Sequence, residues 1–283
     1  MNTTARLTIR VPFCFYECRF CPQGAISGQH PDTRHAYMAA LLKELAAGAE
    51  DCAGQRVDSV HITGGIIAAA DGHDLDALLT LVRSAYPLTE DCQIVLNAYP
   101  GTVNVPTVRG AMKHHVTAID CEVFTADGRD RLRAGLSGDS EAMGLTHYVY
   151  LNTGFNGAAT TLLCGLPGQT EISFRKSLGM TVSCAPRYIS VLPCPGTEGN
   201  AAMAAHAEKY LTENGYTRYA EGRYARGAAP LRCYLPEEDN VDYPGFGLGA
   251  CSRIDGIRCR NTQVLSEYIA HSDDPAVIVR VEG

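Results

Sequence analysis

The chain has 283 residues and a formal net charge of −7, from 24 Lys and Arg against 31 Asp and Glu. It contains no run rich in Lys or Arg and no Trp, which excludes a nucleic acid as the main partner. The N-terminus lacks the apolar run of a signal peptide, and no apolar stretch reaches membrane-spanning length. We therefore expect a cytoplasmic protein whose 12 cysteines are thiols or metal ligands, not disulfides.

Six apolar runs with strand character alternate with helical patterns. Helices are expected to open at Asp32 and at Asp74, each acting as an N-cap, and a third helix is expected over 170–180. The segment 145–152 is mixed in character, and we interpret it as a helix that ends at Gly154. The expected strands are 7–11, 57–63, 92–98, 116–124, 159–166 and 188–192. This alternation predicts an α/β fold with a parallel sheet curled into a partial or full barrel.

The pattern changes after Thr197. A helix over about 198–214 precedes a stretch rich in Gly, Arg and Tyr and then a glycine-rich segment at 243–250. We divide the chain into a barrel core, 1–197, and a small C-terminal cap region, 198–283, which we expect over the mouth of the barrel. The tyrosines of this region are expected to line a pocket for a planar ligand or to pack the cap: Tyr216, Tyr219, Tyr224 and Tyr234.

Cys14, Cys18 and Cys21 follow the first strand with the spacing C-x3-C-x2-C. Three thiolates on one loop suit three irons of a [4Fe-4S] cubane and leave the fourth iron open to a small molecule. Two alternatives remain. The first is a structural zinc site completed by a residue such as His30 or His35, and the second is a set of unligated thiols.

The C-x3-C-x2-C loop resembles the signature of the radical S-adenosylmethionine (SAM) superfamily. Further segments are similar to motifs of its oxygen-independent coproporphyrinogen III oxidase-like (HemN-like) group: 9–14 (IRVPFC), 163–170 (LCGLPGQT), 192–197 (LPCPGT) and 245–252 (GFGLGACS), then Asn261 and Tyr268. The resemblance implies a partial (β/α)6 radical SAM barrel of TIM type with a small cap. It also implies a [4Fe-4S] cluster on the three cysteines, with one SAM, or two, as cofactor.

The resemblance also assigns SAM contacts by position. Gly64 and Gly65 match two glycines of the family's GGGTP turn, and Asn97, Glu122 and Thr161 stand where the family has an acid, a Gln and an Asp. The arginine that pairs with the SAM carboxylate is matched by Arg133, or by Arg131 if the alignment slips. The remaining contacts are Phe20 near the adenine and the turn that contains Leu166 and Gly168.

Several features depart from the family. Pro22 follows Cys21, so the fourth nearby cysteine of coproporphyrinogen oxidases is absent. Cys251 replaces a His of the glycine-rich loop, and we interpret it as a candidate catalytic residue that contacts substrate. Five late cysteines are candidate ligands of a second cluster or are simple thiols: Cys184, Cys194, Cys233, Cys251 and Cys259.

These observations favour an enzyme that cleaves SAM to a 5′-deoxyadenosyl radical and modifies a small aromatic or tetrapyrrole-like substrate. Carbon methylation or another carbon–carbon bond formation is preferred over oxidative decarboxylation of the coproporphyrinogen oxidase type. The alternative is a haem- or cluster-binding carrier with the same fold and no radical turnover. An external electron donor such as flavodoxin or ferredoxin is expected, in an anaerobic or microaerobic setting because open clusters are oxygen-sensitive.

Overall fold

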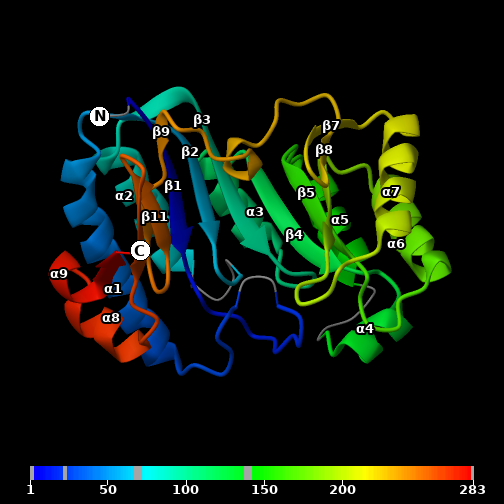
Figure 1. The fold of residues 1–283 in the computed structure, drawn as a ribbon, viewed down its shortest axis with the longest axis horizontal. Helices are drawn as coiled ribbons and strands as arrows, with labels where there is room; N and C mark the ends of the chain where they lie inside the picture. Colours follow the sequence, from blue (N-terminus) through cyan, green and yellow to red (C-terminus); the bar gives the residue numbers. More distant parts are fainter. Residues whose placement is uncertain (1–2, 22–23, 67–71, 137–141, 282–283) are drawn as a thin grey trace.

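The computed structural model describes residues 3–21, 24–66, 72–136 and 142–281. Its centre is a curved sheet in which six parallel strands follow one another in chain order (Figure 1). The sheet does not close on itself, so the barrel is partial. All six strands expected from the sequence are present. These strands are β1 (Thr4–Arg10), β2 (Arg56–Thr63), β3 (Leu88–Ala98), β4 (Ala118–Phe124), β5 (Ala158–Cys164) and β6 (Tyr188–Pro193).

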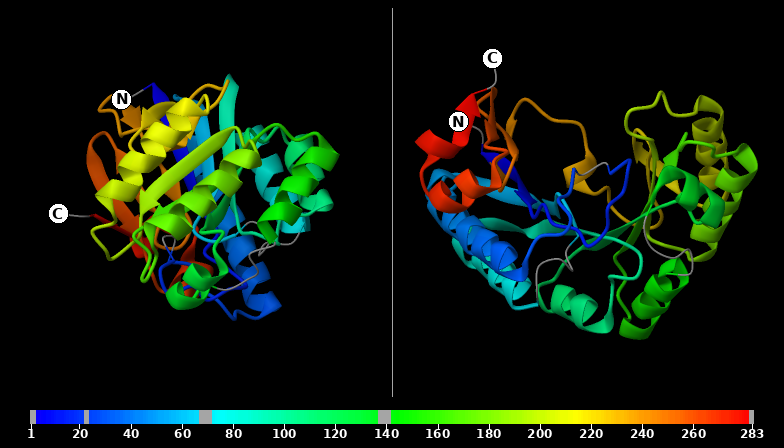
Figure 2. Two further views of the ribbon diagram at one scale, coloured as in Figure 1. Left: turned by 90° about the vertical axis from the view of Figure 1, so that its right-hand side faces the viewer. Right: turned by 90° about the horizontal axis from the view of Figure 1, so that it is seen from below.

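Helices cover the convex face of the sheet, and the concave face remains on the open side (Figure 2). They bury apolar side chains against the strands, as Leu41 and Leu45 of the first helix and Leu78 and Leu79 of the second do. This packing fixes the positions of the strand ends, and these ends carry the candidate site. The helices are α1 (Pro31–Asp51), α2 (Gly72–Ala85), α3 (Val105–Lys113), α4 (Gly128–Ala134), α5 (Ala142–Thr153), α6 (Glu171–Ser183) and α7 (Ala201–Glu213).

Two expected N-caps are wrong. His30 is the N-cap of α1, because its ring accepts from the Asp32 amide at 3.3 Å and Pro31 occupies the first helical position. Asp74 lies inside the first turn of α2, which begins at Gly72. Helix α5 confirms the helical interpretation of 145–152. Helices α3 and α4 were not expected, because each is too short to show a clear helical periodicity.

The segment after Thr197 extends both edges of the sheet. Strands β7 (Thr217–Ala220) and β8 (Arg223–Ala225) continue it antiparallel to β6, while β9 (Val241–Asp242) and β10 (Gly245–Phe246) pair parallel with β1. The chain then forms a small sheet beside α1. This sheet contains β11 (Cys251–Ile254), β12 (Ile257–Asn261) and β13 (Val279–Val281), with α8 (Leu265–His271) and α9 (Pro275–Ile278) beside it.

Part of this C-terminal region lies at the end of the barrel opposite its mouth. The 3₁₀ turn η2 (Arg232–Tyr234) is held by bonds from Arg232 Nη1 to the carbonyls of Asp58 and Asp91, at 3.0 and 2.9 Å. Both partners lie in the N-terminal halves of their strands, and Figure 1 shows the turn near the upper ends of β3 and β4. The turn therefore closes the floor of the barrel, which differs from the expected cap over the mouth. The boundary at residue 197 stays a prediction.

Among the described residues, no helix combines the length and the apolar character that crossing a bilayer requires.

Candidate functional site

The three-cysteine loop leaves the carboxyl end of β1, where the active sites of parallel barrels lie. The loop is tied back on itself, because the Cys14 amide donates to the Ile26 carbonyl at 3.0 Å and the Ile26 amide donates to the Pro12 carbonyl at 2.6 Å. The Cys21 amide donates to the Cys18 carbonyl at 3.2 Å, which makes a tight turn between the second and third cysteines. Figure 2 shows the loop lying across the open end of the barrel.

The three thiols are free and half-buried. Burial, the largest cause, and the nearby Cys18, Cys21 and Glu122 together raise the pKa of the Cys14 thiol to about 11. Within the described part of the chain, no three His, Cys, Asp or Glu side chains converge on one point as a single metal ion requires. In a cubane each thiolate binds a different iron, so the sulfurs stand apart. The three thiols on one loop supply the donor set that three irons of a [4Fe-4S] cluster require.

Both histidines considered for zinc have described partners outside the cysteine loop. His30 caps α1, and His35 Nδ1 lies 3.1 Å from Asp74 Oδ2 at the start of α2.

Gly64 and Gly65, just after β2, lie against the cysteine loop. Gly64 has a φ of +91°, in the left-handed region that glycine favours. A Cβ atom on Gly65 would lie 2.1 Å from the Phe13 carbonyl oxygen and 2.6 Å from the Val11 carbonyl oxygen. The Ile66 amide donates to the same Phe13 carbonyl at 3.0 Å. The glycine pair thus allows the turn after β2 to hold the backbone that leads into Cys14.

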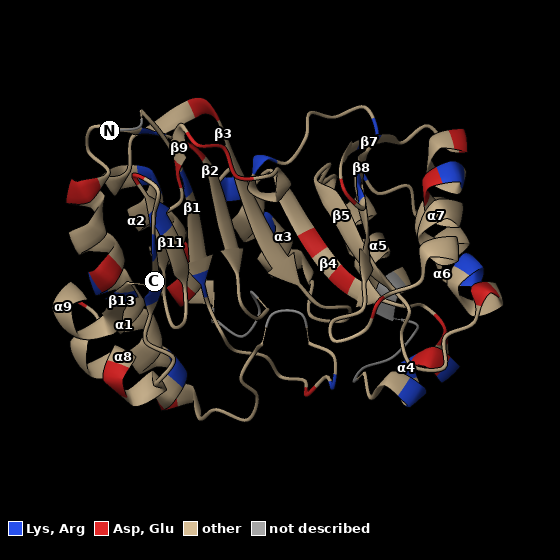
Figure 3. Ribbon diagram, in the orientation of Figure 1, with Lys and Arg blue, Asp and Glu red and all other residues tan. Residues whose placement is uncertain are grey.

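Asn97 and Glu122 meet on the inner face of the barrel. Asn97 Nδ2 donates to Glu122 Oε1 at 3.0 Å, and Asn97 Oδ1 lies 2.8 Å from His61 Nε2. Because the amide nitrogen faces the carboxylate, its oxygen accepts, so His61 carries its proton on Nε2. Burial lowers the pKa of His61 to about 4, which keeps the ring neutral. The chain of bonds orients Glu122, whose charge reaches Cys14. Figure 3 shows the positions of the acidic residues along β4 in red.

Thr161 belongs to a second polar group nearer the barrel floor. Its hydroxyl lies within 3.0 Å of both Asp120 carboxylate oxygens, and Tyr234 of the floor turn donates to Asp120 Oδ2 at 2.7 Å. Arg223 lies over the Tyr234 ring, 3.8 Å from its centroid. The structure therefore brings Asn97 and Glu122 together but engages the Thr161 hydroxyl with Asp120, a residue that sequence analysis did not single out. Tyr234 packs the floor of the barrel.

Helix α4 places two arginines beside the mouth. Arg131 is 4% exposed and donates from Nη1 to the Val123 and Thr125 carbonyls and from Nη2 to the Tyr99 hydroxyl. Arg133 is exposed and donates from Nη1 to the Gly168 carbonyl at 2.9 Å. The helix ends at Gly135, where a Cβ atom would lie 3.5 Å from that of Arg19 in the cysteine loop. Both candidate arginines thus come from a helix that contacts this loop.

Phe20 is partly buried and packs against the main hydrophobic core. Leu166 is buried, and Gly168, with a φ of +73°, closes the turn between β5 and α6. A Cβ atom on Gly168 would lie 2.9 Å from Arg133 Cδ. The space that this glycine leaves is therefore filled by a side chain of α4.

Cys251 is exposed at the first residue of β11, in the small sheet beside α1. Its described neighbours belong to that sheet and to Gly245 of β10, so its catalytic role stays a prediction. The other late cysteines lie on separate elements: Cys184 caps α6, Cys194 follows β6, Cys233 lies in η2 and Cys259 lies in β12. Within the described ranges they form no shared metal-binding group.

The glycine-rich motif and the residues that follow it meet around Glu44 of α1. Its carboxylate accepts from the Gly247 amide at 2.7 Å, from Asn261 Nδ2 at 2.6 Å and from the Tyr268 hydroxyl at 2.5 Å. A Cβ atom on Gly247 would lie 2.4 Å from the Arg10 carbonyl oxygen. The motif therefore holds the end of β1 in place, and the close approach that Gly247 allows is to backbone and not to a ligand.

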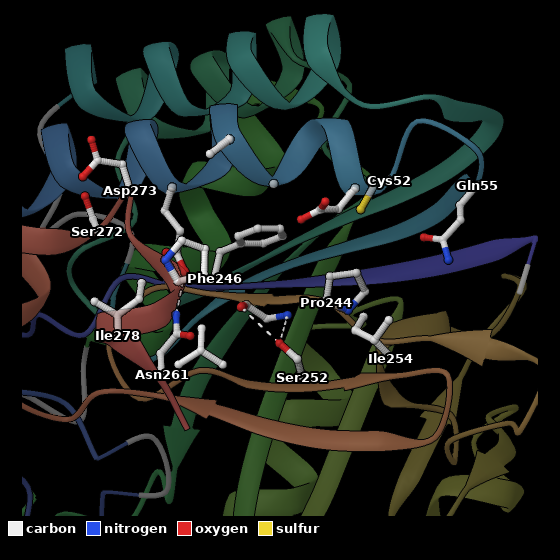
Figure 4. A pocket seen from close by; sticks show the side chains of 17 residues that line it. Cys52, Gln55, Pro244, Phe246, Ser252, Ile254, Asn261, Ser272, Asp273 and Ile278 are labelled. Carbon is white, nitrogen blue, oxygen red and sulfur yellow. Dashed lines mark hydrogen bonds between the residues drawn. The ribbon is translucent and has the colours of Figure 1, made fainter. Parts of the chain in front are cut away.

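A cavity of about 460 Å³ lies behind this network, between α1 and the small C-terminal sheet (Figure 4). Cys52, Phe246, Ile254 and Ile278 line it, and none of the cysteine-loop or inner-face residues does. It is separate from the candidate site.

No family model matches the chain. The heme chaperone HemW of Synechocystis sp. is 24% identical over 92% of this chain and 68% of its own length. HemW of Escherichia coli is 25% identical over 91% of this chain and 73% of its own length. The solved structure of coproporphyrinogen III oxidase (HemN) from Escherichia coli, a radical SAM enzyme, has a TM-score of 0.83 at 20% identity and covers 99% of this chain and 71% of that chain. The chain resembles the HemN-like group of radical SAM proteins over nearly its whole length.

This similarity confirms the expected resemblance, and the strand order confirms the expected partial α/β barrel. Sequence analysis missed His61, Tyr99 and Asp120. Alternation along the strands carries a signal for two of them, since Tyr99 lies two residues after Asn97 and Asp120 two residues before Glu122. His61 had no such signal, because its role depends on the pairing of β2 with β3.

Proposed function

We propose that this HemN-like protein binds a [4Fe-4S] cluster through Cys14, Cys18 and Cys21 and binds SAM at the iron that these thiolates leave open. The observation that carries this proposal is the half-buried loop with three free thiols at the carboxyl end of β1. When bound, the cluster and SAM supply a one-electron cleavage of the bond between the SAM sulfur and C5′, which yields methionine and a 5′-deoxyadenosyl radical. Flavodoxin or ferredoxin supplies the electron.

The protein's own residues hold SAM over the loop. The polar backbone after β2, at Gly64 and Gly65, would bind the SAM amino group. Glu122, which Asn97 orients, would accept from a ribose hydroxyl. Arg133, exposed beside Gly168, would pair with the SAM carboxylate. Thr161 acts indirectly, by fixing Asp120 beneath this layer.

The substrate is a small planar molecule of the tetrapyrrole class. Three relatives support this choice by name, two as heme chaperones and one as a coproporphyrinogen oxidase. Carbon methylation has weaker support, because it rests on the missing fourth cysteine and the altered SAM contacts alone. The setting of the reaction is a reducing cytoplasm.

The test is anaerobic reconstitution with iron and sulfide, followed by reduction in the presence of SAM and assay of nucleoside products. We expect about four irons per chain, as a cubane requires, and formation of 5′-deoxyadenosine. The variant Cys18→Ser should lose both, whereas Cys92→Ser, outside the loop, should retain them. A cluster-replete wild-type protein that forms no 5′-deoxyadenosine would contradict the enzymatic proposal. Methylthioadenosine beside 5′-deoxyadenosine would support methyl transfer.

The second candidate function is carriage of haem without radical turnover. It is favoured by the two heme chaperones among the relatives and by Ile66 and Ile67 in place of the threonine and proline of the family turn. Haem titration followed by absorbance separates the two functions. Stoichiometric haem binding by a cluster-replete protein that forms no 5′-deoxyadenosine would establish the carrier.

A further inference from the structure

Tyr99 connects the cysteine loop to the buried arginine of α4. Its hydroxyl lies 3.9 Å from Cys18 Sγ and accepts a bond of 2.6 Å from Arg131 Nη2. The Arg131 guanidinium also lies over the Tyr99 ring, 5.7 Å from its centroid. Tyr99 is 2% exposed and Arg131 is 4% exposed. A cationic group is therefore held behind a tyrosine hydroxyl that faces one of the three thiols.

Tyr99 is fixed through both its backbone and its ring. Its backbone carbonyl accepts from Thr102 Oγ1 at 2.7 Å, and its backbone amide donates to Thr102 Oγ1 at 3.2 Å. Its ring packs against Tyr16 of the cysteine loop, with centroids 4.8 Å apart. Arg131 is fixed in turn by its bonds to two backbone carbonyls. The distance between hydroxyl and sulfur is thus set by packing and not by a freely rotating side chain.

The direction of the contact depends on the state of the thiol. A free Cys18 thiol donates its hydrogen to the Tyr99 oxygen. A thiolate bound to iron has no hydrogen, so the contact persists only if the tyrosine O–H donates to sulfur. Because Arg131 donates to the Tyr99 oxygen, it polarises the O–H bond and strengthens this donation.

We propose that Tyr99, polarised by Arg131, donates a hydrogen bond to the cluster sulfur of Cys18 and raises the reduction potential of the cluster. The inference rests on the proposed function, since it requires the cluster. The reduced cluster carries one more negative charge than the oxidised cluster. A donor and a cation beside it therefore stabilise the reduced form, as hydrogen bonds to cluster sulfurs do in general. Tyr99 and Arg131 act here as positioning and tuning residues.

The test is a redox titration of the reconstituted protein in the absence of SAM, followed by electron paramagnetic resonance of the reduced cluster. Tyr99→Phe keeps the ring and the buried volume but removes the hydroxyl. We expect its midpoint to move to more negative potential, so that the ratio of reduced to oxidised cluster at a fixed potential falls about threefold to tenfold; tenfold corresponds to about 59 mV for a one-electron couple. Omitting SAM separates this effect from any role of Arg131 in SAM binding.

The matched control is Tyr86→Phe. Tyr86 is also buried, and its hydroxyl donates to the Leu45 carbonyl at 2.7 Å, in the layer between the sheet and α1. This variant should keep the wild-type midpoint. Arg131→Met should shift the midpoint in the same direction as Tyr99→Phe, and Arg131→Lys should restore part of the shift because it retains the charge.

The outcomes separate the two proposals. A wild-type protein that takes up no iron would overturn the proposed function. If the wild-type protein binds a cluster and Tyr99→Phe has the same midpoint potential, the tuning role is overturned and the proposed function stays intact. A shift in Tyr86→Phe equal to that in Tyr99→Phe would have the same consequence. If Tyr99→Phe fails to retain the cluster, Arg131→Met decides, and an unchanged midpoint there overturns the inference.

Discussion

Asn97 spans the gap between His61 and Glu122, with its amide nitrogen 3.0 Å from Glu122 Oε1 and its amide oxygen 2.8 Å from His61 Nε2. One side chain on β3 therefore satisfies a polar group on each neighbouring strand. An acid at this position would place a second carboxylate beside Glu122, which like-charge repulsion disfavours while His61 is neutral. The amide is compatible with a neutral His61 and an ionised Glu122.

Replacing Asn97 should destabilise the protein through these two partners. Asn97→Ala leaves a buried imidazole N–H and a buried carboxylate oxygen without their described bonds, at an expected loss of about 1–3 kcal/mol in the free energy of unfolding. Urea unfolding measures it. Asn152→Ala is the control, because that exposed side chain bonds only to a carbonyl within its own helix among the described contacts. A loss no larger than that of the control would contradict the bridging role.

His61 should give the folded protein a defined acid sensitivity. Burial lowers its pKa from 6.5 to about 4, so the unfolded chain binds a proton in this window and the folded protein does not. The free energy of unfolding therefore falls as the pH falls from 6.5 towards 4, by about 3 kcal/mol across the window.

The measurement is urea unfolding of wild type and His61→Gln at pH 7 and pH 5. Wild type should lose about 2 kcal/mol more than His61→Gln between these two values. His73→Gln, which replaces an exposed histidine of α2, should keep the wild-type dependence. Parallel pH profiles for wild type and His61→Gln would show that His61 does not titrate in this way.

Gly65→Ala should disturb the cysteine loop directly. The added Cβ meets two backbone carbonyl oxygens, at 2.1 and 2.6 Å, and neither can turn aside as a flexible side chain would. We expect reconstituted iron per chain to fall several-fold. Gly54→Ala is the control, since a Cβ at that position meets no atom within 4 Å. Full iron incorporation in Gly65→Ala would contradict the close packing of the two turns.

Tyr268→Phe tests the network that anchors the end of β1. It removes one of the three described donors to the buried Glu44 carboxylate, at an expected cost of about 1–3 kcal/mol in the free energy of unfolding. The control is Tyr148→Phe, because Tyr148 is 64% exposed. Both variants are compared by denaturant midpoint at pH 7. Equal midpoints for the two variants would mean that the Tyr268 hydroxyl contributes nothing to stability.

Local pattern was sufficient for much of this molecule. The six strands were predictable because parallel strands buried on both faces form apolar runs, and the cysteine spacing is a property of one short loop. The group was predictable from short motifs in which each glycine or cysteine has a local reason to be present. Asn97 and Glu122 were predictable as neighbours because both lie near the carboxyl ends of adjacent strands.

Other features depend on contacts between segments far apart in the sequence. The late glycine motif meets Glu44 about 200 residues away in the sequence, and the floor turn pairs with the N-terminal halves of β2 and β3.

The sequence alone indicated the resemblance to the HemN-like group, the six parallel strands and the three-cysteine loop, because these depend on residue type and local spacing. The tertiary structure decided which side chains surround that loop: Tyr99 behind Cys18, Arg131 behind Tyr99, and Asn97 between His61 and Glu122. The physical reason is that hydrogen-bond partners across a barrel are set by strand register and helix packing. Neither of these is encoded in any short stretch of the chain.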